Sequence, residues 1–262
     1  QVIIKMNSKS ILYKCWLNFR NCMTNKTREG YIRYCKNIFA KEDNAVIQTA
    51  VTELKYALEE IFDTEVCIHK NRPKGPHIFV GTVAKARDEG YEIEADLKRE
   101  GFCVKNVTEN NDDFILIAGN DNSGVLYGIF YFIRSISIGK AIQEISAVDY
   151  PRNQLRIINH WDNISGKIER GYAGDSIFYK NDRIVEDTTR VKDYARLLAS
   201  VGINGIVINN VNVHELETRF ITEEYLPDIA RLADIFRSYG IKTYLSINFA
   251  APIEIGQLDT AD

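Results

Sequence analysis

The chain has 262 residues, of which 45% are hydrophobic and 26% charged, with a formal net charge of −3. This composition is typical of a globular protein long enough for two domains, and the charge argues against a nucleic-acid-binding surface. No apolar run approaches the roughly 18 residues that span a bilayer, which argues against a membrane protein. No signal peptide is recognisable, and because the sequence opens with Gln1 we expect it to be processed or cut from something longer.

The cysteines and histidines show no metal-binding pattern. Their spacings fit neither a C-x-x-C motif nor an H-x-x-x-H pair, so we predict reduced thiols and no metal site. The compartment stays open, because an odd cysteine count favours a reducing environment while Gln1 is compatible with a cleaved precursor. The cysteines, all in the first 103 residues, are Cys15, Cys22, Cys35, Cys67 and Cys103.

Residues 1–150 read as one α+β domain. Apolar residues recur with helical spacing over Asn44–Phe62, where Asp43 is a plausible N-cap, and again over Ser123–Ile138. Strands mixed with two amphipathic helices predict an α+β sandwich whose helices lie on one face of the sheet. The predicted strands lie near 34–39, 65–69, 77–80, 101–106 and 113–118.

The glycine-containing stretch GNDNSG, residues 119–124, invites comparison with a phosphate-binding loop. A P-loop places Lys and then Ser or Thr after its second glycine, but Val125 and Leu126 follow here. We therefore predict a strand-to-helix turn in which Asp121 or Asn122 caps the second helix.

From Pro151 onward the sequence contains an internal repeat. SVGINGIVINN, which starts at Ser200, aligns with SYGIKTYLSIN, which starts at Ser238, and each copy follows an amphipathic helix (189–201 and 223–239). Gly202 and Gly240 lie where a helix C′ glycine belongs, and apolar strands follow at 205–209 and 243–247, after an earlier one at 155–158. The pattern predicts an incomplete (β/α)8 barrel of about three strands over residues 151–262, with a doubly wound sheet as the alternative.

On such a barrel the active-site face lies at the carboxyl ends of the strands. The residues there are amides beside one large aromatic ring, a combination that suits a sugar, since an indole face packs on a pyranose and amides bond its hydroxyls. The residues that we expect to bind substrate are Trp161, Asn209, Asn210, Val211 and Asn248.

Several long motifs resemble the α-glucuronidases of glycoside hydrolase family 67. RIINHWDNISGKIERGYAGDSIF (from Arg156), GINGIVINNVN (from Gly202) and YGIKTYLSINFAAPIEIGQLDTAD (from Tyr239) resemble the first three barrel strands of that family and the loops after them. GVLYGIFYFIRSI (from Gly124) resembles the end of its N-terminal α+β domain, whereas the first forty residues match only loosely, chiefly at YKCWLNF.

This resemblance implies an exo-acting, inverting enzyme without a cofactor that removes α-1,2-linked (4-O-methyl)glucuronic acid from xylan-derived xylo-oligosaccharides. Inversion needs a carboxylic acid and a carboxylate base on opposite sides of the sugar, and in the family these come from later strands, beyond Asp262. We therefore assign no catalytic residue within the chain. A homodimer, common in the family, would form through a region that this chain does not contain.

The resemblance also implies roles for the strand-end residues. Trp161 would pack against the uronic sugar, or else plug the mouth of the barrel, and Val211 would lie near a 4-O-methyl group. The three asparagines would sit near the sugar or shape the floor of the site. His160 is expected to be a hydrogen-bonded structural residue, and Glu169 with Arg170 an ionic staple of the loop.

Two other function classes remain open. One is a non-catalytic module, either a carbohydrate-binding remnant or a barrel fragment completed by another chain, because a three-stranded parallel sheet leaves edges unpaired. The other is a hexosaminidase-type hydrolase with a similar front domain, although the run INHWDN…ERGYAG argues against it.

Overall fold

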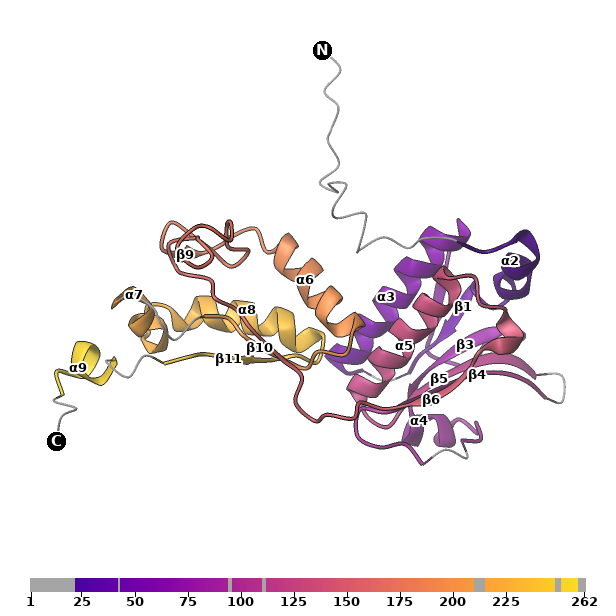
Figure 1. The fold of residues 1–262 in the computed structure, drawn as a ribbon. Coiled ribbons are helices and arrows are strands. Elements are labelled where there is room, and N and C mark those ends of the chain that lie inside the picture. Colours follow the sequence, from indigo (N-terminus) through magenta and orange to yellow (C-terminus); the bar gives the residue numbers. More distant parts are fainter. Residues whose placement is uncertain are drawn as a thin grey trace, which may run out of the picture. The chain divides into compact units, whose positions relative to one another are not determined.

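The computed structural model describes residues 22–41, 43–93, 96–109, 112–209, 215–247 and 251–258. The chain divides into two compact units, residues 1–152 and 153–262. Figure 1 labels the helices and strands of both units. In the described part of the chain, no helix is long and apolar enough to cross a membrane.

Unit 1 is built on a six-stranded mixed sheet with the strand order β2-β1-β3-β5-β4-β6. Strands β2, β1, β3 and β5 are parallel to one another, whereas β4 pairs antiparallel with both β5 and β6. The strands are β1 (Asn37–Phe39), β2 (Cys67–His69), β3 (His77–Thr82), β4 (Phe102–Glu109), β5 (Asp112–Gly119) and β6 (Ser146–Asp149). The central strands β3 and β5 can be followed in Figure 1.

Helices α3 (Ala45–Phe62) and α5 (Asn122–Ser137) pack against each other and cover one face of this sheet. Their buried positions follow the helical spacing expected from the sequence. The cap of α3 was predicted one residue too early: Asn44, not Asp43, accepts the hydrogen bond from the Val46 amide at 2.9 Å.

The two predicted helices lie on one face of the sheet, but the opposite face carries a helix that was not predicted. The short helix α4 (Val83–Asp88) contacts β3 and β5 on the face opposite α5, where Ala86 joins an aromatic cluster. That cluster contains Phe79, Tyr91 and Phe114, with ring centroids 4.5 Å (Phe79–Tyr91) and 4.8 Å (Tyr91–Phe114) apart. Strands covered on both faces need apolar residues at successive positions, which explains the fully buried run His77–Gly81.

The remaining described elements of unit 1 are a short helix α2 (Asn25–Ile32) and a 3-10 turn η1 (Ile142–Glu144). The described cysteines form no disulfide. Cys35 and Cys103 are buried, and burial raises the pKa of both thiols, so they behave as apolar core residues rather than nucleophiles.

Unit 2 contains a three-stranded parallel sheet, order β11-β10-β7. Its strands are β7 (Ile157–Asn159), β10 (Gly205–Val207) and β11 (Lys242–Tyr244), each of which overlaps a predicted strand. Helix α6 (Thr189–Ser200) leads into β10 and α8 (Leu226–Ser238) into β11, and the two helices pack against each other. Gly202 and Gly240 have φ values of +79° and +70°, as expected for glycines that end helices.

Four smaller elements of unit 2 were not anticipated. Two short strands form a hairpin between β7 and α6, and two helices follow β10 and β11. These are β8 (Tyr179–Lys180), β9 (Arg183–Ile184), α7 (Glu215–Thr218, continued by the 3-10 turn η2, Arg219–Ile221) and α9 (Ala251–Gly256).

Candidate functional site

The three parallel strands of unit 2 bring their carboxyl ends to one edge of the sheet. Asn159 pairs in register with Val207, and Val207 with Tyr244, so the residues that follow these positions start at the same level. Asn210, Val211 and Asn248, three of the predicted substrate-binding residues, lie outside the described residues. Trp161 and Asn209 are therefore the predicted residues whose surroundings the structure shows.

Trp161 follows strand β7 with its indole 44% exposed. Its carbonyl accepts a hydrogen bond from the Glu169 amide at 3.0 Å, which ties the start of the loop to its middle. A large aromatic side chain that is nearly half exposed on a hydrogen-bonded loop offers ring surface to a ligand. Its role as a substrate-binding residue stays a prediction.

His160, next to Trp161, is held on both sides of its ring. Its Nε2 lies 2.7 Å from the Tyr194 hydroxyl on α6, and its Nδ1 lies 3.3 Å from Asp162 Oδ1. The ring also makes edge contacts with Phe178 and Tyr194, at 5.0 and 5.2 Å between centroids. This environment agrees with the structural role that we expected for His160.

Asp162 is the buried centre of this network. It is only 2% exposed, and its second carboxylate oxygen accepts from the Ser176 hydroxyl. Ser176 Oγ in turn accepts from the amides of Phe178 and Tyr179, at 3.0 and 3.1 Å. The network therefore connects the end of β7, the loop after it and the β8 strand.

Two tyrosines in this region, the buried Tyr179 and the partly buried Tyr194, stay protonated. Burial, with a smaller contribution from the Asp162 carboxylate, raises the pKa of Tyr194 to about 12. Burial also raises the pKa of Tyr179, whose hydroxyl donates to the Ile208 carbonyl at 3.0 Å. A protonated Tyr194 can donate to His160 Nε2, which leaves the His160 Nδ1–H to face Asp162.

Asn209 fixes the strand ends to each other. It is fully buried, its amide nitrogen donates to the Ser246 carbonyl at 2.8 Å, and its oxygen accepts from the Ser246 amide at 2.9 Å. Because both polar atoms bond to the backbone after β11, the geometry favours a role in shaping the floor of the site. Strand β10 ends at Val207, so Asn209 lies in the segment that follows the strand.

Glu169 is bonded differently from the ionic staple expected with Arg170. Its carboxylate accepts from the Tyr172 hydroxyl at 2.7 Å, and its carbonyl accepts from the Asn163 side-chain amide. Glu217, which we did not anticipate, is buried and accepts from the Ile164 amide at 3.1 Å. Nothing local in the sequence marks Glu217, since α7 was not predicted and its contact lies 53 residues away along the chain.

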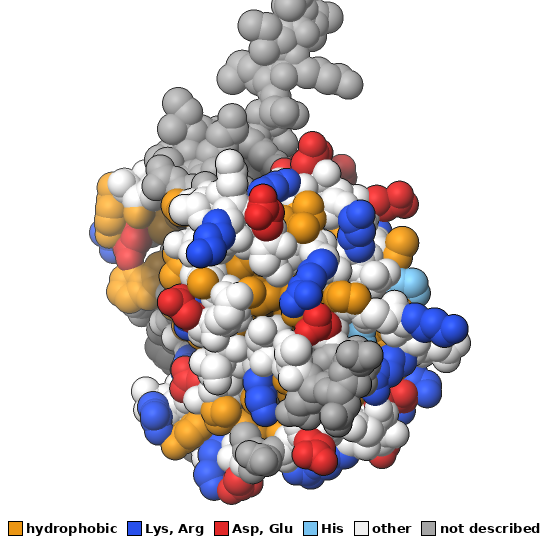
Figure 2. Space-filling view, turned by 90° about the vertical axis from the view of Figure 1, so that its right-hand side faces the viewer, with side chains coloured by type: hydrophobic (Ala, Val, Ile, Leu, Met, Phe, Trp, Pro, Cys, Tyr) orange, Lys and Arg blue, Asp and Glu red, His pale blue; other side chains and the backbone are white. Residues whose placement is uncertain are grey.

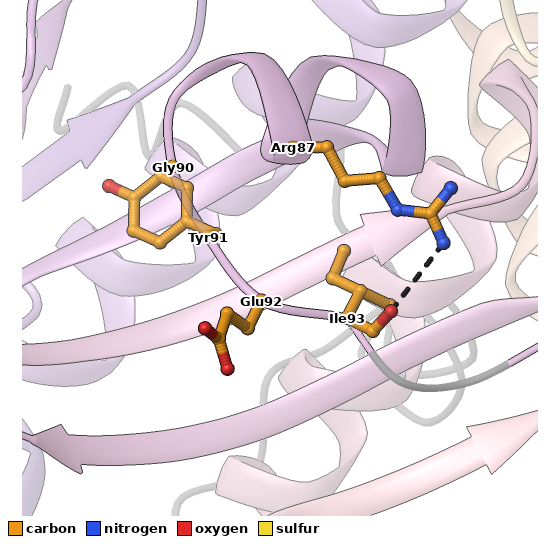
Figure 3. A pocket seen from close by; sticks show the side chains of 5 residues that line it. All are labelled: Arg87, Gly90, Tyr91, Glu92 and Ile93. Atoms are coloured by element: carbon orange, nitrogen blue, oxygen red, sulfur yellow. Dashed lines mark hydrogen bonds between the residues drawn. The ribbon is translucent and has the colours of Figure 1, made fainter.

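A pocket of about 430 Å³ lies in unit 1, beside the turn after α4 (Figure 3). It is lined by Arg87, Gly90, Tyr91, Glu92 and Ile93, and the Arg87 guanidinium donates to the Ile93 carbonyl at 3.5 Å. Within the described residues, no three His, Cys, Asp or Glu side chains are grouped to hold a metal ion. Figure 2 shows unit 1 from the right-hand side of Figure 1, with basic and acidic side chains mixed over that face.

The glycines of the GNDNSG stretch have a packing role. Asp121 caps α5 as predicted, since its carboxylate accepts from the Gly124 amide at 2.9 Å and from the Glu100 amide at 2.8 Å. A Cβ on Gly124 would lie 2.2 Å from the Gly101 carbonyl oxygen, so only glycine fits there. The turn thus packs directly on the backbone at Gly101.

Two consecutive domain families match almost the whole chain. Residues 15–132 match the N-terminal domain of glycosyl hydrolase family 67, and residues 135–262 match its middle domain. The chain therefore belongs to glycosyl hydrolase family 67, as its motifs predicted.

Curated relatives agree with this assignment. The chain is 37% identical to alpha-glucuronidase A of Emericella nidulans over 226 residues, which cover 82% of this chain and 26% of that protein. It is 35% identical to alpha-glucuronidase A of Aspergillus tubingensis over 218 residues, which cover 82% of this chain and 25% of that protein. The chain thus spans about a quarter of the length of the curated relatives that it matches.

Solved structures show the same fold at low sequence identity. A family GH115 4-O-methyl-alpha-glucuronidase with specificity for decorated arabinogalactans aligns with a TM-score of 0.53 and 19% identity, over 78% of this chain and 28% of that one. A GH138 enzyme that targets pectin rhamnogalacturonan II aligns with a TM-score of 0.53 and 15% identity, over 80% and 24%.

Proposed function

We propose that this chain is the N-terminal portion of an α-glucuronidase that acts on xylan-derived oligosaccharides. The reaction is hydrolysis, with inversion, of α-1,2-linked glucuronic acid or 4-O-methylglucuronic acid. The observation that carries the proposal is the match of both consecutive domains to one glycoside hydrolase family, together with relatives named alpha-glucuronidase. Residues 1–150 form the accessory domain and residues 151–262 the start of the catalytic domain.

In this proposal, β7, β10 and β11 are the first three strands of a (β/α)8 barrel. Their parallel order and the helices between them support it, because successive barrel strands are neighbours joined by helices. The side chains after their carboxyl ends then line the substrate pocket. Trp161 packs against the uronic sugar, and Asn209 fixes the backbone at the base of the pocket through its bonds to Ser246. Asn210, Val211 and Asn248 line the same side of the pocket.

The proposal assigns no catalytic acid or base within residues 1–262. Inverting hydrolysis needs two carboxyl groups about 6.5–9.5 Å apart across the sugar, with room for a water molecule. Of the two buried carboxylates described near the strand ends, Asp162 accepts a hydrogen bond from the Ser176 hydroxyl. Glu217 accepts one from the Ile164 amide with one carboxylate oxygen, and its other oxygen is buried without a hydrogen-bond partner. The family resemblance puts the reacting groups on later strands.

Hydrolysis of 4-O-methylglucuronosyl xylotriose tests the proposed function. We expect turnover by the protein at its natural length and none by a clean preparation of residues 1–262. Turnover by residues 1–262 would show that the catalytic groups lie within them. Binding of the oligosaccharide without cleavage by the protein at its natural length would instead favour a non-catalytic carbohydrate-binding module.

Binding at Trp161 is tested by fluorescence. Residues 1–262 contain two tryptophans, so in a preparation of these residues Trp16→Phe leaves Trp161 as the sole reporter. We expect glucuronic acid to change Trp161 emission in that background, because a pyranose stacked on an indole alters its solvent exposure. Xylose at the same concentration is the control, and an identical response to both sugars would argue against a uronate site.

A further inference from the structure

The loop between β7 and β8 exposes two large aromatic rings, not one. Trp161 is 44% exposed and Tyr172 is 77% exposed, and both belong to the same stretch of the chain. Single exposed aromatic residues are common on protein surfaces and need no explanation. A pair on one loop after a strand end calls for a closer look at how the loop holds them.

Glu169 connects the two aromatic residues. Its backbone amide donates to the Trp161 carbonyl at 3.0 Å, and its carboxylate accepts from the Tyr172 hydroxyl at 2.7 Å. It does so with φ of +54°, in the left-handed region that a residue with a Cβ occupies at a steric cost. Glu169, in a strained backbone conformation, thus bonds both to the backbone of Trp161 and to the side chain of Tyr172.

The rest of the loop is also fixed. Asp162 forms an isolated antiparallel bridge with Ile168, and Lys167 forms another with Asp175. Gly171, with φ of +99°, starts the turn that returns Tyr172 to Glu169. An exposed tyrosine on a braced loop loses little conformational entropy when a ligand covers its ring.

We propose that Tyr172 is a second carbohydrate-stacking residue, which binds the neutral xylose units of the oligosaccharide, with Glu169 as its positioning residue. This inference rests on the proposed function, in which Trp161 contacts the uronic sugar. The remaining substrate is then uncharged xylose, whose apolar ring face matches a tyrosine ring. The Glu169 carboxylate beside the Tyr172 hydroxyl disfavours a uronate at the same place.

The test separates the two parts of the substrate. In the protein at its natural length, calorimetric titrations measure the affinity for xylotriose and, separately, for glucuronic acid. Steady-state kinetics with 4-O-methylglucuronosyl xylotriose give KM and kcat. The variants are Tyr172→Ala, Tyr172→Phe, Glu169→Gln and Trp161→Ala.

Tyr172→Ala should weaken xylotriose binding and raise KM by about tenfold, the effect of losing one aromatic stacking contact. Glucuronic acid affinity should stay within about twofold, since it depends on a separate contact. Tyr172→Phe keeps the ring and should lose less than about threefold. Glu169→Gln keeps an acceptor oxygen for the Tyr172 hydroxyl and should stay close to the parent protein.

Unchanged xylotriose affinity in Tyr172→Ala would overturn the inference. Equal loss of affinity for both ligands would also overturn it, because that pattern means general damage to the loop. Trp161→Ala tests the underlying proposal independently: it should weaken glucuronic acid binding more than xylotriose binding. If Trp161→Ala leaves glucuronic acid affinity unchanged, the proposed role of Trp161 fails, whatever the Tyr172 result.

Discussion

Asp162 and Asp175 lie in the same loop but in opposite environments. Asp162 is 2% exposed, accepts from the Ser176 hydroxyl and lies 3.3 Å from His160 Nδ1, whereas the Asp175 side chain is 78% exposed in an ion pair with Lys167. Burial decides which of the two matters for stability, because a buried hydrogen-bonded carboxylate leaves unsatisfied donors behind when it is removed. The sequence shows two loop aspartates and does not distinguish them.

We predict that Asp162→Ala lowers the free energy of unfolding of unit 2 by about 2–4 kcal/mol, since the partly buried Ser176 hydroxyl and His160 ring lose the buried carboxylate that they face. The measurement is urea denaturation followed by Trp161 fluorescence in the Trp16→Phe background, which reports on unit 2. Asp175→Ala is the matched control and should leave the transition unchanged, because water replaces an exposed ion pair. Equal shifts in the two variants would contradict the proposed importance of the buried network.

At the scale of the elements, the helix-to-strand connections of unit 2 depend on glycine. Gly202 lies in the connection between α6 and β10 and has a φ of +79°. The nearest atom to a Cβ built on it is Arg156 Nε, 4.0 Å away. Space is therefore not the constraint at Gly202; the backbone conformation is. This separates Gly202 from Gly124, where a Cβ would collide with backbone.

Gly202→Ala should destabilise unit 2 by about 1 kcal/mol, because alanine is strained at positive φ. Gly202→Asn should cost less, since asparagine tolerates the left-handed region better than alanine does. Thermal or urea unfolding followed by Trp161 fluorescence measures both. Gly256→Ala, at a glycine without positive φ and with ordinary contacts to Leu258 at 3.4 Å, is the control. A stable Gly202→Ala variant would show that the connection can rearrange.

At the scale of the whole chain, the two units differ in how their sheets are covered. The unit 1 sheet packs against α3 and α5 on one face and against α4 on the other. In the unit 2 sheet, Ile157 is 40% exposed and Tyr244 is 38% exposed, on the face opposite the buried Ile206. A parallel sheet normally has both faces covered, so an open apolar face predicts dependence on further chain or on a partner.

We therefore predict that residues 1–152 form a monomeric, cooperatively folded protein. Residues 153–262 alone should aggregate or form large oligomers, because the Ile157–Tyr244 face stays open. Size-exclusion chromatography and thermal melting by circular dichroism test both fragments. A monodisperse fragment 153–262 with a sharp melting transition would show that three strands suffice for this unit.

The sequence by itself determined the features that depend on local chemistry. Apolar residues at helical spacing predicted α3 and α5, helix-ending glycines predicted the two turns of the repeat, and Asp121 was recognised as a cap. Long motifs around Trp161 were enough to identify the family, because family membership is recognised from the order of residues along the chain. These signals are contained within short stretches of chain, where propensity and capping act.

The tertiary structure alone decided which polar residues support the site and which remain free for a ligand. His160 bonds to Tyr194, 34 residues away, and Asn209 bonds to Ser246, 37 residues away. Tyr91 enters the aromatic core opposite α5 through a turn that shows no apolar period. Burial and hydrogen-bond satisfaction are set by groups distant in sequence, so no local pattern distinguishes Asp162 from Asp175 or Trp161 from a core residue.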